Sequence, residues 1–148
     1  MTKKLYNVVL SEKQLLVLAE AANLMQRVQL GQWREIEDSL PLRKPIDYEK
    51  LHQDMETIGE VLSRHMTDGI DGYRTSLGVG SQTLPESSSI LYDLRQTIEH
   101  KISWERAVQE GIVESESSPR DWSKMMTVNF DPPMKWSDEP LPKITRIN

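Results

Sequence analysis

The chain of 148 residues contains no cysteine and only one phenylalanine. Without cysteine, a disulfide framework, thiolate catalysis and a cysteine zinc site are excluded. No run approaches the roughly 20 consecutive apolar residues of a membrane-spanning helix. The apolar stretch near the start, Val8 to Leu10, is too short for a signal peptide. We therefore expect a cytoplasmic protein with no membrane partner.

Basic residues are also in deficit, with 18 lysines and arginines against 23 acidic residues and a net charge of −5. Proteins that bind duplex DNA or anionic membranes usually present a basic surface, so the balance disfavours both. The acidity is concentrated between Glu35 and Glu60, a pattern typical of a solvated helix face. A basic patch would form only if the fold gathered residues that are spread along the chain: Arg64, His65, Arg74, Lys101, Arg106, Lys124 and Arg146.

Signatures of catalysis are missing as well. The sequence has no Gly-x-Ser-x-Gly elbow and no P-loop, and the glycine pair at 78–81 stands alone. None of the three histidines belongs to a His-Glu-x-x-His motif, and a zinc site needs three or four convergent ligands. His52 with Glu49 and Glu56 is better interpreted as a surface cluster. We expect a protein without metal or cofactor that is not an enzyme.

Apolar periodicity predicts the fold class. The length fits a single domain, 1–148, and apolar residues recur at helical spacing in three long segments. The predicted helices are Glu12–Leu30, Tyr48–Arg64 and Ser88–Val108, with a short helix at Gln32–Ser39. We expect a mainly α protein in which the three long helices form an antiparallel bundle, with a helical core spanning about 11–110.

Local signals mark where these helices begin and end. Ser11 followed by Gln14 is typical of a capping box, in which each side chain binds the other residue's backbone N–H. Asp47 is a second predicted N-cap, and Gly31 is expected to end the first helix.

The two ends of the chain predict extended structure. Lys4–Leu10 is rich in β-branched and apolar residues and is expected to pair with Met126–Phe130 in a short N-/C-terminal β-ribbon. Residues 111–148 are expected to form an extended C-terminal tail over the helices, anchored by Trp122, Phe130 and Trp136. A glycine- and serine-rich loop at 67–89 joins the second and third long helices.

Three stretches resemble a group of small uncharacterised bacteriophage proteins. They are Ala21–Trp33, Tyr92–Arg106 and Asp138–Ile144, which together carry an Arg-x-x-x-Gly-Gln-like turn and a Tyr-Asp-Leu helix with His and Trp. The group has no activity that could be carried over. The resemblance therefore implies a phage or prophage origin, hence the host cytoplasm, and implies nothing about mechanism.

The third long helix carries the candidate binding site. Tyr92, Gln96, His100 and Trp104 are spaced four residues apart, which places them on one slowly turning face. Arg95 and Glu99 flank this ladder. If the first helix packs here, Arg27 and Gln32 would join it. Stacking rings with charged and amide donors would suit a nucleotide-like ligand.

The same residues have a structural interpretation. Buried polar groups usually pair with one another, so the ladder could be a satisfied network at a helix–helix seam, with Arg27 paired to Glu99. Trp33 and Trp104 lie beside apolar rows and fit a hydrophobic core.

Two functional hypotheses follow. The first is a non-catalytic phage accessory protein that sequesters a nucleotide-like host signalling or defence molecule, with the glycine-rich loop as a lid. The alternative is a protein–protein interaction module that inhibits a host protein or joins a phage replication or assembly complex. Its support is the acidic second helix and the proline-rich tail. The apolar stripe of Tyr48–Arg64, with Met55 and Met66 near it, further predicts a homo-oligomer.

Overall fold

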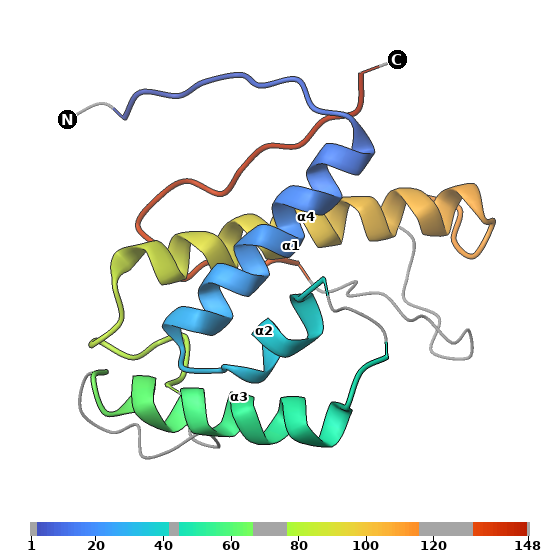
Figure 1. Cartoon of the computed structure of the whole chain (residues 1–148). Helices are drawn as coiled ribbons and strands as arrows, with labels where there is room; N and C mark the ends of the chain where they lie inside the picture. The colour runs from blue at the N-terminus through green and yellow to red at the C-terminus, as the bar shows by residue number, and fades with distance from the viewer. Residues whose placement is uncertain (1–2, 42–44, 67–76, 116–131, 148) are drawn as a thin grey trace.

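The computed structural model describes residues 3–41, 45–66, 77–115 and 132–147, and its regular structure is helical throughout this part of the chain (Figure 1). The helices are α1 (Glu12–Gln29), α2 (Arg34–Ser39), α3 (Tyr48–Ser63) and α4 (Glu86–Gln109). The mainly α class is thus confirmed. None of the described helices is long and apolar enough to cross a membrane. The predicted strand Met126–Phe130 and the predicted anchors Trp122 and Phe130 lie outside the described residues, as does loop segment 67–76.

The predicted ends of α1 and α3 are confirmed. Gln14 N donates to Ser11 Oγ (3.2 Å) and Ser11 N donates to Gln14 Oε1 (2.8 Å), which completes the capping box. Asp47 caps α3 by accepting from Lys50 N at 3.0 Å. α1 ends as Gly31 adopts a φ of 78°, a left-handed conformation that only glycine enters without strain.

The main core forms where α1 crosses α4 (Figure 1). Ala19 on α1 lets the helices approach closely, and Ile98 on α4 is fully buried beside it. Partly buried apolar residues complete this core: Leu15, Leu16, Leu94 and Ile144. Because Ile144 comes from the C-terminal segment, the tail contributes to the core as well as covering it.

The predicted antiparallel three-helix bundle is not confirmed. Among the described helices, α3 packs only on α2, which separates it from the α1–α4 core (Figure 1). Met55 is buried and Trp33 Nε1 donates to Ser63 Oγ at 3.2 Å, so these residues hold α3 in place. The stripe of α3 is only partly covered, since Ile58 and Leu62 remain 46% and 39% exposed. Helix α2 spans only Arg34–Ser39 and is too short to cover the apolar stripe of α3.

The predicted β-ribbon is not formed by the residues that the structure describes. Residues 3–10 are extended but make no backbone–backbone hydrogen bond to another described segment. Residues 132–147 are also extended, and their attachment to the core comes from side chains of α4 instead of a strand. The described part of the C-terminal segment is therefore attached by the Asp93 side chain, with no ladder among the described residues.

Candidate functional site

The crossing of α1 and α4 brings two arginines to one amide oxygen. Arg27 Nε donates to Asn23 Oδ1 at 3.2 Å, and Arg95 Nη1 of α4 donates to the same oxygen. Arg27 Nη1 also donates to Gln32 Oε1, just beyond the end of α1. Asn23 and Arg27 lie four residues apart on one face of α1, which explains their contact. We call Arg27 and Arg95 the arginine pair.

The arginine pair has few close acceptors for its two positive charges. The two described acceptors of Arg27 are neutral amide oxygens. The side chain of Arg95 is 12% exposed, and its buried Nε has no hydrogen-bond acceptor. The nearest carboxylate oxygen, Glu99 Oε2, lies 3.8 Å from this Nε, beyond hydrogen-bond length. A cation removed from water normally needs a close anion, and Glu99 provides Arg95 with an ion pair but no hydrogen bond.

One aromatic ring lies beside Arg95, and a second ring packs on the first. The guanidinium carbon of Arg95 is 5.6 Å from the centroid of the Tyr92 ring, within cation–π range. Trp136 from the C-terminal segment meets Tyr92 edge to face, with centroids 6.4 Å apart. A Cβ on Gly80 would lie 2.8 Å from the Trp136 indole, so this loop position must lack a side chain. The C-terminal segment therefore completes the aromatic side of the site.

Asp93 fixes that segment in place. Its buried carboxylate accepts from Trp136 N (2.8 Å), Ser137 N (2.9 Å) and Ser137 Oγ (2.6 Å). Asp93 was not among the site residues predicted from the sequence. Its available signal was a carboxylate between the apolar residues of the α4 row, where an unpaired charge would be costly.

His100 and Trp104 form a separate group. Their rings meet edge to face with centroids 6.3 Å apart. Trp104 is buried against Ala107 and Val113, which confirms the expectation that this tryptophan belongs to a core. His100 Nδ1 is buried and has no hydrogen-bond partner. The predicted ladder thus divides along α4 into two environments.

The candidate residues are therefore only partly brought together. The arginine pair gathers the first group of predicted residues: Arg27, Gln32, Tyr92, Arg95 and Glu99. Gln96 lies on α4 between the two groups, with polar contacts of its own. The expected pairing of Arg27 with Glu99 is wrong, because Asn23 and Gln32 accept from Arg27 instead. Asn23, which joins the two helices, was missed because its role depends on a long-range contact.

No metal centre is seen in the described segments, where no group of three potential ligands converges. His52 is 44% exposed and lies 3.4 Å from Glu37 and 3.7 Å from Glu56, whereas Glu49 is not among its ion-pair partners. These are surface ion pairs, which contribute little to stability.

A cavity of about 520 Å³ opens between α1 and α2. Its lining mixes apolar, acidic and polar side chains: Val17, Glu20, Ala21, Asn23, Leu24, Glu35, Asp38 and Ser39. We call this cavity the α1–α2 groove. Its three carboxylates would repel an anion, so an anionic ligand of the arginine pair would not be held there.

Comparison of the chain with protein-family models, with curated protein sequences and with solved structures found no match.

Proposed function

We propose that this protein acts by binding without turnover, and that its ligand is a nucleotide-like anion held by Arg27 and Arg95. The observation that carries the proposal is that two guanidinium groups share one neutral amide oxygen, while the one carboxylate paired with them, Glu99, lies 3.8 Å from Arg95 Nε. A phosphate group would supply a closer negative charge. Arginine binds phosphate with paired, charge-assisted hydrogen bonds that are stronger than bonds to neutral amides.

The surroundings of the arginine pair support the nucleotide-like character of the ligand. Tyr92 provides an aromatic ring beside Arg95, and Trp136, which packs on Tyr92, remains 42% exposed. A base placed against these rings would have its phosphate within reach of Arg95. Stacking of this kind typically contributes about 1–3 kcal/mol per base.

Binding without turnover defines the biological role that we propose. The resemblance to bacteriophage proteins suggests a phage accessory protein, and such a protein could sequester a nucleotide signal or defence molecule of its host. The absence of catalytic motifs in the sequence is consistent with a protein that holds its ligand without transforming it.

The proposal is tested by titrating the protein with cyclic mononucleotides, linear mononucleotides and dinucleotides. Binding is measured by tryptophan fluorescence and calorimetry. Replacing Arg95 by Met should weaken binding by about tenfold or more, because a charge-assisted hydrogen bond contributes about 1.5–3 kcal/mol. The same variant should keep or increase its free energy of unfolding, since it removes a poorly neutralised buried charge.

Arg106→Gln is the matched control for this titration. Arg106 lies on the same helix, but it is exposed and pairs with Glu12 at 2.7 Å, so its loss should leave nucleotide affinity within about twofold. If no nucleotide bound, or if Arg95→Met unfolded the protein without a specific loss of binding, the arginine pair would be a structural network.

The surface of α3 favours a protein–protein module as a second candidate function. Ile58, Val61 and Leu62 are exposed on a helix that also presents acidic side chains such as Glu60. An apolar strip with an acidic border fits a basic host protein. The expected result is a salt-sensitive complex that Glu60→Lys weakens while nucleotide affinity is unchanged. A complex whose affinity changes neither with salt nor with Glu60→Lys would contradict the protein–protein module.

A further inference from the structure

The N-terminal arm, which we define as residues 3–10, carries a dense set of exposed apolar side chains. Its exposed fractions are among the largest in the described part of the chain: Leu5 77%, Tyr6 83%, Val8 72% and Val9 77%. Four exposed apolar residues within five positions, interrupted only by Asn7, are typical of an interaction segment.

The backbone of the arm is equally unpartnered. Residues 3–9 make no backbone–backbone hydrogen bond to any other segment that the structure describes. The arm is attached near its start by Lys3, whose Nζ donates to Asp138 O (2.8 Å) and Glu139 Oε1 (2.9 Å). Figure 1 shows the arm beyond the C-terminal segment, on the side of the molecule away from α2 and α3. An extended chain with free N–H and C=O groups is a ready partner for another surface.

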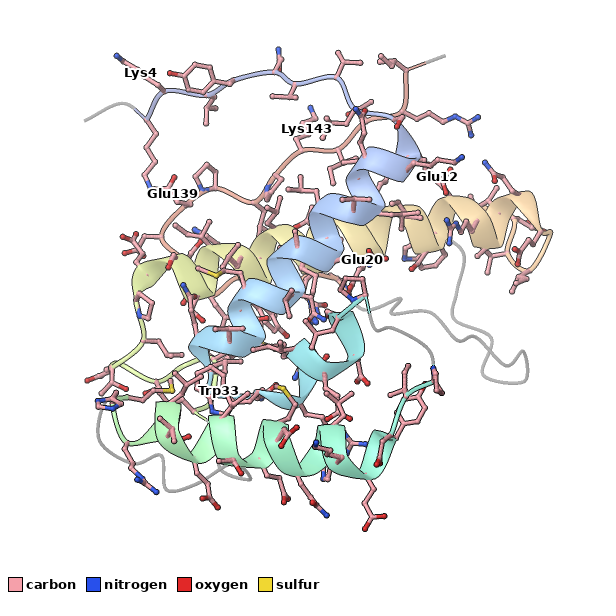
Figure 2. All side chains as sticks on the ribbon, viewed as in Figure 1. Lys4, Glu12, Glu20, Trp33, Glu139 and Lys143 are labelled. Atoms are coloured by element: carbon pink, nitrogen blue, oxygen red, sulfur yellow. The ribbon has the colours of Figure 1, made fainter. Side chains whose placement is uncertain are left out.

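The α1–α2 groove has the complementary chemistry. Val17, Ala21 and Leu24 contribute apolar side chains to its lining, and Val17 is 63% exposed. Glu20, Glu35 and Asp38 also line it, and none of the three has an ion-pair partner among the described residues. Figure 2 labels Lys4 on the arm and Glu20 beside α2. Lys4 is exposed, and it too has no ion pair with another described residue.

We propose that the arm of one copy binds in the α1–α2 groove of a second copy. The apolar side chains of the arm would cover those of the groove lining, and Lys4 would meet its carboxylates. Because both surfaces belong to the same chain, two copies can exchange arms about a two-fold axis, which gives a closed dimer. The homo-oligomer expected from the sequence would then form through the arm, a different surface from the stripe of α3.

Disulfide cross-linking between full-length chains tests the contact, because the natural sequence has no cysteine that could interfere. Two single variants, Val8→Cys and Glu20→Cys, are mixed and oxidised, and the linked peptides are identified by mass spectrometry. Cysteines link only when their Cβ atoms approach within about 4.5 Å. We expect the Val8–Glu20 link between chains, well above a control mixture of Val8→Cys with Glu110→Cys.

Placing both cysteines in one chain distinguishes binding of the arm to a second copy from binding of the arm to the groove of its own chain. A preformed dimer of this double variant is diluted and then oxidised. Links between chains support the proposal. Links found only within single chains show that the arm occupies the groove of its own chain, which overturns the proposal. A link no more abundant than the Glu110 control also overturns it.

Sedimentation of the full chain over a wide concentration range provides the second measurement. The chain should reach a dimer mass, and Leu5→Asp with Val8→Asp should raise the dimer dissociation constant by about tenfold or more, as expected from losing buried apolar side chains. Because Leu5 and Val8 are exposed in the monomer, the variant should keep its helical circular dichroism and its melting temperature at monomer concentration. A native chain that stays monomeric at all concentrations, or a variant that dimerises as well as the native chain, would overturn the proposal.

Discussion

At the scale of single residues, Asp93 decides where the C-terminal segment runs. One buried carboxylate satisfies two backbone N–H groups and one hydroxyl of Trp136 and Ser137. If the carboxylate were removed, the two buried donors of Ser137 and the partly buried Trp136 N would lose this acceptor. Trp136 then lies against Tyr92, so the position of a proposed site ring depends on this carboxylate.

Replacing Asp93 by Ala is expected to lower the free energy of unfolding by about 2–4 kcal/mol, because buried donors lose their acceptor. Urea denaturation followed by tryptophan fluorescence measures the change. Asp138→Ala is the control, since Asp138 is exposed on the same segment and should change stability by less than about 0.5 kcal/mol. Equal stability of the two variants would show that Asp93 does not anchor the segment.

At the scale of elements, the end of α4 depends on a single glycine. Gly111 has a φ of 69°, and this turn lets Ile112 N donate to Ala107 O at 2.9 Å. The chain then folds back, so that Val113 packs with Trp104 and Ala107. A left-handed residue at this position is therefore the condition for the second hydrophobic cluster.

Gly111→Ala should destabilise the protein by about 1–2 kcal/mol, the cost of a left-handed conformation for an L side chain. A Cβ at Gly111 would meet nothing within 4 Å, so backbone strain is the only source of the loss. Asn tolerates this conformation better, and Gly111→Asn should recover part of the stability. Gly78→Ala is the matched control, because Gly78 has open space and no positive φ. Thermal unfolding that ranks Gly78→Ala as the more damaging substitution would contradict this account.

At the scale of the whole molecule, stability is expected to be uneven. α1 and α4 share the main core around Ile98, whereas α3 packs on α2 alone among the described helices. Few buried contacts join α3 to the rest, with Met55 and the Trp33–Ser63 hydrogen bond as the main attachments. Regions of this kind open at lower free energy than the core of the same domain.

Hydrogen exchange should therefore show faster amide exchange in α3 than in the centre of α4. Trp33→Phe removes the hydrogen bond to Ser63 and should speed exchange in α3 by up to about tenfold, while the amides around Ile98 are unchanged. Equal amide exchange rates in α3 and in the centre of α4 would show that α3 and the α1–α4 core unfold as one unit.

The sequence by itself determined the features that depend on neighbours along the chain. The helical class, the capping box of Ser11 with Gln14, the Asp47 cap and the end of α1 at Gly31 were all predicted. Each of them depends on residues within four positions of one another, where hydrogen bonding and periodicity are local. The predicted site also contained the two arginines and Tyr92, because their spacing placed them near the helix seam.

Only the tertiary structure decided the features that depend on distant pairs. Asn23 joins Arg27 to Arg95 across 72 positions, and Asp93 reaches Ser137 across 44, separations that no periodic pattern records. The position of α3 outside the core was likewise decided by where α2 lies, and the arm at residues 3–10 found no strand partner among the described residues. The physical reason is that a side chain shows its type in the sequence, whereas its partner is selected by which helices pack together and by what remains unpaired when they do.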